Sequence, residues 1–183
     1  MFQRLAIPDI VLVQPKRHGD ARGYFCETYR EADYAENGVH GPFVQDNEAF
    51  SEDAGTLRGL HFQVAPTAQG KLISCTQGAI FDVAVDLRSS SASFGQYVGV
   101  DLSAENGHQL YIPPGFAHGY LTRSTNCLVQ YKVSAYYSPD DERGLAWNDP
   151  DIGIAWPLDG RSPILSEKDS DLPGLHALQS AFA

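Results

Sequence analysis

The chain has 183 residues, 43% of them hydrophobic and 20% charged, which is ordinary globular composition and predicts a single domain over 1–183. The 13 basic and 23 acidic residues give a formal net charge of −10, which argues against nonspecific binding to nucleic acids or anionic membranes. The three cysteines form no short-range pair and predict neither a disulfide framework nor a zinc site. The N-terminus lacks a usable signal peptide and no apolar run approaches about 20 residues, so we expect a soluble cytoplasmic protein.

In chain order, the first predicted element is a short helix over 30–36, ended by Asn37-Gly38. Strand signals dominate the middle, where short segments rich in Val, Ile, Tyr and Phe recur near every ten residues, as in a sandwich or barrel. A tight hairpin turn is predicted at 76–79. From about residue 139 the pattern is irregular, which predicts a C-terminal extension over 139–183 packed on the barrel. Its last dozen residues form either a short packed helix or a frayed tail.

The segment TLRGLHFQ, residues 56–63, is the first that could carry chemistry. Strand alternation places Gly59 and His61 on one face and Arg58 on the other, unless Gly59 marks a bulge that re-aims Arg58. A histidine inside a barrel is a candidate base because histidine ionises near neutrality. A lone strand histidine can equally be structural, and the segment alone leaves both readings open.

Two further strands present polar groups to the predicted interior. Lys71 shares a strand face with Ile73, although a lysine at the start of a strand is usually solvated. Tyr131 shares an apolar face with Val129 and Val133, which predicts an inward phenol that needs a polar partner. Tyr131 is therefore either a core aromatic or an acid or binding group.

The acidic residues Asp82 and Asp86 share one face of the strand FDVAVD and could simply be solvated, while Asp82 is also a conceivable partner for His61. Residues 113–118, PPGFAH, fit the second half of the cupin signature P-x-G-x-x-H. The first half needs two histidines one residue apart and a glutamate, of which only His61 is present. Because the ligand set is incomplete, we predict no bound metal.

Nine motifs together are highly specific for one family. They are DARGYFCE (20–27), QDN (45–47), TLRGLHFQ (56–63), AQGK (68–71), GAIFDVAVDLR (78–88), LSAEN (102–106), IPPGFAHGY (112–120), ERGLAWNDP (142–150) and LSEKD (165–169). With these motifs in this order, the chain resembles the dTDP-4-dehydrorhamnose 3,5-epimerases of dTDP-L-rhamnose biosynthesis. The resemblance extends from about residue 2 to 170.

The resemblance implies an all-β, metal-free, cupin-type jelly roll with a few short peripheral helices, which needs no cofactor and works as a homodimer. It implies inversion of C3 and C5 of dTDP-4-dehydro-6-deoxy-D-glucose. The implied catalytic residues are His61 as general base, Asp169 as the carboxylate that orients it, Tyr131 as general acid and Lys71 as the cation that stabilises the enolate.

These residue types suit the chemistry, because the C4 ketone acidifies the hydrogens at C3 and C5. Histidine, with an ordinary pKa near 6.5, can remove such a proton, and tyrosine, with an ordinary pKa of about 10, keeps a proton to return from the other side. A fixed cation stabilises the enolate charge that develops.

The resemblance also implies a set of substrate-binding residues. Arg58 would hold the diphosphate, Arg22 and Lys168 would make further anion contacts, Tyr137 would stack on the thymine, and Glu27, Gln45, Asn47, His118 and Glu142 would line the nucleotide or sugar pocket. The N-terminal strand that carries Arg22 and Glu27 would reach the neighbouring subunit's site.

Several alternatives stay open. The chain could be a mono-epimerase acting at C3 or C5 only, or a 3,4-ketoisomerase of another deoxysugar nucleotide pathway, although the presence of Tyr131 favours two inversions. It could also be a catalytically silent cupin that only binds nucleotide sugars. The carboxylate partner of His61 is Asp169 by the resemblance, with Asp82 as the alternative.

Overall fold

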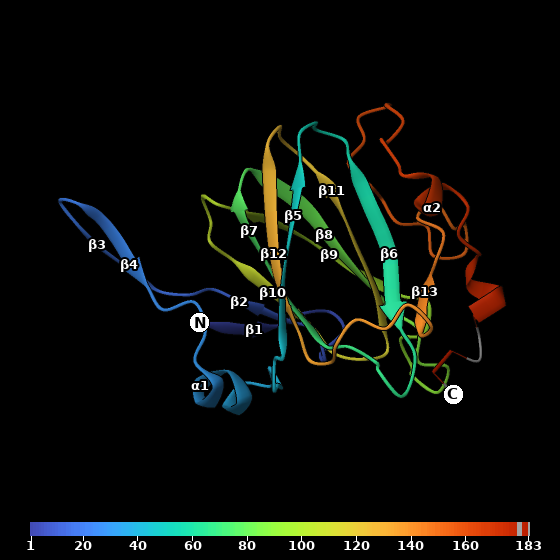
Figure 1. Cartoon of the computed structure of the whole chain (residues 1–183), viewed down its shortest axis with the longest axis horizontal. Coiled ribbons are helices and arrows are strands. Elements are labelled where there is room, and N and C mark those ends of the chain that lie inside the picture. Colours follow the sequence, from blue (N-terminus) through green and yellow to red (C-terminus); the bar gives the residue numbers. More distant parts are fainter. Residues whose placement is uncertain (179–180, 183) are drawn as a thin grey trace.

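The computed structural model describes residues 1–178 and 181–182, and β-strands make up most of the regular structure there (Figure 1). The larger sheet has the order β1 (Phe2–Arg4), β2 (Val11–Val13), β10 (Gln109–Ile112), β7 (Lys71–Gln77), β12 (Cys127–Val133) and β5 (Gln45–Ser51). The second has the order β13 (Glu142–Gly144), β6 (Leu57–Gln63), β11 (Phe116–Thr122), β8 (Ala79–Asp86) and β9 (Tyr97–Ser103). Neighbouring strands within both sheets run antiparallel. This two-sheet sandwich confirms the predicted all-β fold.

An apolar core fills the space between the two sheets. Leu110, Ile73 and Val129 of the larger sheet belong to one cluster with Ile80 and Leu102 of the second sheet, and all five are fully buried. Each such side chain contributes about 1.5–3 kcal/mol when it is removed from water. The core therefore fixes the spacing of the sheets, and with it the polar side chains that face inward further along the same strands.

The reversal predicted at 76–79 exists, but the prediction of a hairpin is wrong. Gly78, with φ +77°, leads directly from β7 into β8. However, β7 pairs with β10 and β12, whereas β8 pairs with β9 and β11 in the other sheet. A glycine at a positive φ permits a sharp change of direction, and it does not decide whether the next strand pairs with the previous one or crosses to the opposite sheet.

The peripheral elements are short. The helix predicted over 30–36 is confirmed as α1 (Glu31–Glu36), with Asn37 as its C-cap. The helix α2 (Glu167–Ser170) lies close to β6. No helix in the described ranges is long and apolar enough to cross a membrane.

Much of the C-terminal part of the chain covers the outer face of the second sheet. The 3₁₀ helix η1 (Leu175–Leu178) buries Leu175 and Leu178 in a cluster with Phe62 and Val83, so the last dozen residues contain a packed helical turn. Residues 179, 180 and 183 of that segment lie outside the described residues.

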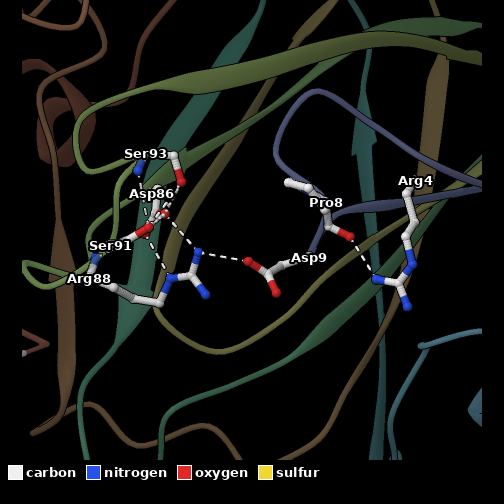
Figure 2. Close-up of polar contacts among 7 residues, drawn as sticks. All are labelled: Arg4, Pro8, Asp9, Asp86, Arg88, Ser91 and Ser93. Atoms are coloured by element: carbon white, nitrogen blue, oxygen red, sulfur yellow. Dashed lines mark hydrogen bonds and ion pairs between the residues drawn. The ribbon is translucent and has the colours of Figure 1, made fainter.

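The covered outer face explains why the expectation of solvated aspartates on β8 is wrong. Asp82 and Asp86 are both completely buried, because β8 lies between two strands and both of its faces are packed. Figure 2 shows how the Asp86 carboxylate forms an ion pair with Arg88 and accepts hydrogen bonds from Ser91 and Ser93.

The hairpin formed by β3 (Arg17–Asp20) and β4 (Gly23–Cys26) projects away from the sandwich (Figure 1). Its aromatic side chains Tyr24 and Phe25 are 60% and 69% exposed. Within the described chain, this arm therefore leaves two large apolar side chains largely in solvent.

Candidate active site

A cavity of about 590 Å³ lies between the two sheets. Eleven of the thirteen predicted site residues line it. They are Gln45, Asn47, Lys71 and Tyr131 from the larger sheet, Arg58, His61, His118 and Glu142 from the second sheet, Tyr137 from the loop after β12, and Lys168 and Asp169 from α2. The cavity thus gathers polar groups from segments more than 120 residues apart in the sequence.

His61 and Asp169 form a close pair, with 2.6 Å between His61 Nε2 and Asp169 Oδ1. The Asp169 side chain is 6% exposed, and its backbone N–H donates to Ser166 Oγ, the N-cap of α2. Burial is the largest single effect and would raise the pKa of Asp169, but the hydrogen bond and charge of His61, together with hydrogen bonds from Ser166 and the Gly59 backbone, outweigh it and lower the pKa. Asp169 is therefore a carboxylate that holds the His61 ring in a fixed orientation.

A second histidine–aspartate pair resolves the partner left open by the sequence. Asp82 Oδ1 lies 2.7 Å from Nε2 of His118, and both side chains are buried. Asp82 is thus the partner of His118, and His61 pairs with Asp169.

An irregularity in β6 brings Arg58 to the same cavity as His61. His118 pairs with His61 and Tyr120 pairs with Arg58, so two steps along β11 correspond to three steps along β6. Gly59 occupies the extra position with φ +111°, and a Cβ there would lie 2.7 Å from the His118 carbonyl oxygen. The alternative that Gly59 marks a bulge and re-aims Arg58 is the one observed.

Lys71 is buried beside His61, and the expectation that it is solvated is wrong. Its Nζ donates to the His61 backbone carbonyl at 3.2 Å, and the residue is 8% exposed. Burial lowers the pKa of Lys71 to about 8, against the opposing effects of Glu142 and Asp82. The lysine is shielded because its strand lies inside the larger sheet, between β10 and β12. At neutral pH this places a buried cation next to the histidine.

Tyr131 faces His61 from the opposite sheet. The register of the larger sheet places Ile73, Tyr131 and Asn47 in one row, so Tyr131 and Asn47 share a face, and for Tyr131 this is the inward face that the sequence predicted. Burial raises the pKa of Tyr131, and Arg58 opposes this effect. Tyr131 therefore holds its proton at neutral pH on the wall opposite the histidine.

Near α2, Glu142 joins Lys168 and Tyr137. Glu142 Oε2 accepts from Lys168 Nζ at 2.5 Å and from the Tyr137 hydroxyl at 3.0 Å. Together with Lys71 and Arg58, Lys168 makes the cavity locally cationic in a chain of net charge −10. Such a site favours an anionic ligand.

Two predicted site residues lie elsewhere in this chain. Arg22 is at the turn of the projecting hairpin, where its side chain is 89% exposed and pairs with Asp20. Glu27 pairs with Arg30. Neither residue lines the cavity of its own chain.

The cavity also contains residues that the sequence did not single out. Tyr120 lies two positions after His118 on β11, so strand alternation could have placed it on the same face. Gln63 is a scaffold residue, because its side chain bonds the backbone of Thr67, Tyr136 and Ser138.

The fold and the cavity define a class, a cupin-type jelly roll whose cavity holds a histidine–aspartate pair on one side, a tyrosine on the opposite sheet, and cations that suit an anionic ligand. The family model described as dTDP-4-dehydrorhamnose 3,5-epimerase matches residues 4–177. The protein named dTDP-4-dehydrorhamnose 3,5-epimerase from Sinorhizobium fredii NGR234 is 50% identical over 181 residues, 99% of this chain and 92% of that protein.

Solved structures give the same result. The enzyme of that name from Bacillus anthracis strain Ames, with TDP and pyrophosphate bound, has 48% identity and a TM-score of 0.91, and the match covers 95% of this chain and 98% of that one. A dTDP-6-deoxy-D-glucose-3,5-epimerase from Legionella pneumophila, in complex with dTDP-4-keto-L-rhamnose, has 43% identity and a TM-score of 0.91, covering 96% and 93%. The chain belongs to the dTDP-4-dehydrorhamnose 3,5-epimerase family, and its cupin-type jelly roll is confirmed.

Proposed function

We propose that this protein inverts C3 and C5 of dTDP-4-dehydro-6-deoxy-D-glucose and so forms dTDP-4-dehydro-L-rhamnose for dTDP-L-rhamnose biosynthesis. The observation that carries the proposal is the division of a base and an acid between opposite walls of one cavity, with a buried cation beside the base. Inversion at carbon requires this arrangement, since the proton leaves from one face and returns to the other.

In the first half of each inversion, His61 acts as the base. Its Nε2–H donates to the Asp169 carboxylate, which leaves the lone pair on Nδ1 to accept a proton. The C–H bond next to the C4 ketone breaks, its proton passes to His61, and its electron pair forms an enolate. The Lys71 ammonium stabilises the negative charge on the enolate oxygen.

In the second half, Tyr131 donates its phenolic proton to the opposite face of the carbon. The enolate collapses to the ketone and the configuration is inverted. Solvent then returns a proton to the Tyr131 phenolate and takes from His61 the proton that it removed, which resets both groups for the next inversion. C3 and C5 both flank C4, so one ketone, one base and one acid can serve both inversions. No redox cofactor is required, because the substrate is neither oxidised nor reduced.

The remaining cavity residues suit the nucleotide. Arg58 offers a planar guanidinium to the diphosphate, and the half-exposed Lys168 adds a second cation. Tyr137, 53% exposed, has an aromatic face available to stack on thymine. Gln45, Asn47, His118 and Glu142 complete the polar lining.

The protein acts as a homodimer in this proposal, with Arg22 and Glu27 contributing to the partner's site. The support is the projecting hairpin, whose exposed Tyr24 and Phe25 would be buried by a second copy. In that assembly the Arg22 guanidinium, which in this chain pairs with the exposed Asp20, would reach a phosphate.

Proton NMR of the substrate incubated with the protein in D₂O tests the proposal. We expect deuterium at both C3 and C5, and no incorporation with His61→Ala. Deuterium at one carbon only would identify a mono-epimerase, and migration of the ketone would identify a 3,4-ketoisomerase. Binding without exchange at either carbon would contradict the proposal and leave a silent nucleotide-sugar-binding protein.

A further inference from the structure

Two buried side-chain polar atoms lack a hydrogen-bond partner within the described residues, 1–178 and 181–182. They are the Tyr120 hydroxyl and Asp82 Oδ2. Buried polar groups in folded proteins are almost always paired, and each exception calls for an explanation. Asp82 does not line the cavity, whereas the Tyr120 side chain does, so of these two residues only Tyr120 lies beside a bound ligand.

The surroundings of Tyr120 place it between two residues that the proposed reaction uses. Tyr120 on β11 lies opposite Arg58 on β6 in the strand register. Its phenol is also close enough to Tyr131 on the opposite sheet for the two to interact electrostatically. The Tyr120 phenol therefore lies close enough to the expected diphosphate contact and to the expected acid to feel the charge of both.

No group in the described part of the chain meets hydrogen-bond geometry with this hydroxyl. The Ser51 hydroxyl lies near enough to lower the pKa of Tyr120, but the two are not placed for a hydrogen bond. Ser51 Oγ already accepts from Arg58 Nε at 3.1 Å. Burial dominates and raises the pKa of Tyr120, so the phenol remains a hydrogen-bond donor throughout the neutral range.

A phenylalanine at position 120 would fill the same space without burying an unpaired donor, so the hydroxyl destabilises the unliganded protein. We propose that the Tyr120 hydroxyl donates a hydrogen bond to a substrate oxygen at the junction of hexose and diphosphate, which makes Tyr120 a specificity-determining residue. The inference rests on the proposed function for the identity of the ligand. Its acceptor is either a hexose oxygen or an oxygen of the adjoining phosphate.

Isothermal titration calorimetry of Tyr120→Phe with dTDP-glucose and with dTDP tests the inference, because dTDP-glucose lacks the ketone and is not turned over. We expect dTDP-glucose to bind about 3- to 10-fold more weakly, as for the loss of one hydrogen bond. An equal loss for dTDP identifies a phosphate oxygen as the acceptor, and unchanged dTDP affinity identifies a hexose oxygen.

A matched control is Tyr34→Phe, which removes a buried hydroxyl that is already bonded to Thr28 O and the Gln109 side chain, outside the cavity. We expect it to lower the melting temperature and leave both affinities unchanged, whereas Tyr120→Phe keeps or raises the melting temperature. Unchanged affinity of Tyr120→Phe for both ligands would overturn the inference. If the wild-type protein fails to exchange substrate hydrogens while the affinity difference persists, only the proposed function fails.

Discussion

Two regions of this molecule bury a charge, and they treat it in opposite ways. Asp86 receives five hydrogen bonds, from the backbone and side chain of Arg88 and from Ser91 and Ser93. Burial would raise the pKa of Asp86, but these bonds lower it to about 2. In the cavity, Lys71 makes one hydrogen bond to a protein group in the described chain, and burial lowers the pKa to about 8.

The difference distinguishes a structural charge from a functional one. Around Asp86 the fold supplies every partner that the charge needs, and Arg88 also reaches Asp9 and so ties the N-terminal segment to β8 (Figure 2). Around Lys71 the fold leaves bonding capacity unused, and the proposed enolate would use it. The predictions below test whether the cavity groups serve chemistry while the saturated groups serve stability.

The largest expected effect comes from Asp169→Asn. The amide cannot replace the carboxylate that accepts from His61 Nε2–H, so the ring loses its tautomer and orientation, and kcat falls by about 10³-fold. Asp82→Asn is the matched control, because Asp82 pairs with His118, and we expect a loss of less than about tenfold. Steady-state kinetics would contradict the account if the two variants lost activity equally.

Tyr131→Phe separates proton removal from inversion. Without the phenolic proton, His61 can still form the enolate and return deuterium to the same face, so exchange in D₂O continues. We expect the rate of inversion to fall by about 10²-fold, the usual contribution of a positioned acid. NMR distinguishes retention from inversion at the labelled carbons. Loss of exchange in proportion to inversion would show that Tyr131 does not act as the separate acid.

The pKa of Lys71 predicts how enzymatic activity declines at alkaline pH, which is the alkaline limb of the pH profile. The ammonium is needed to stabilise the enolate and loses its proton near pH 8, so kcat/KM falls about tenfold per pH unit above that value. Lys71→Arg keeps a positive charge throughout this range. Whatever its absolute rate, we expect this variant to lose the limb near pH 8. An unchanged limb would assign the titration to another group.

The sequence predicted the contents of the cavity better than its geometry. The motifs identified His61, Lys71 and Tyr131, because family patterns record which residue types the chemistry needs. They could not show that Lys71 is buried, since shielding depends on how strands from two sheets pack. The sequence also did not show that β7 and β8, joined at Gly78, belong to different sheets. A local turn signal does not determine which distant strands each of them pairs with.

Two other features lay beyond local patterns. The redirection of Arg58 depends on an extra residue at Gly59, which alternation left open, and the pairing of His61 with Asp169 joins residues 108 positions apart. A local signal for the short helix that carries Asp169 was present, because Ser166 stands three residues before it, as in an N-terminal cap. The direction in which that helix points still requires the tertiary structure.

The most direct test of the comparison is thermal unfolding of Lys71→Met and Asp86→Asn, measured with activity between pH 3 and pH 10. Folding lowers the pKa of Lys71 from 10.5 to about 8, so its buried charge destabilises the fold fully below pH 8 and not above about pH 10.5. Allowing for one lost hydrogen bond, Lys71→Met should gain about 2 kcal/mol at pH 7, roughly 5 °C in melting temperature, while activity disappears.

The charge of Asp86 has the opposite effect on stability, because it stabilises the folded protein. Its lowered pKa contributes about 2–3 kcal/mol above pH 4, and this stabilisation is lost as the pH falls from about 4 to 2. We therefore predict that Asp86→Asn melts lower at pH 7, by a margin that shrinks towards pH 3, and keeps its activity at temperatures where it is folded. A Lys71→Met protein less stable than the wild type, or a folded Asp86→Asn protein without activity, would contradict the account.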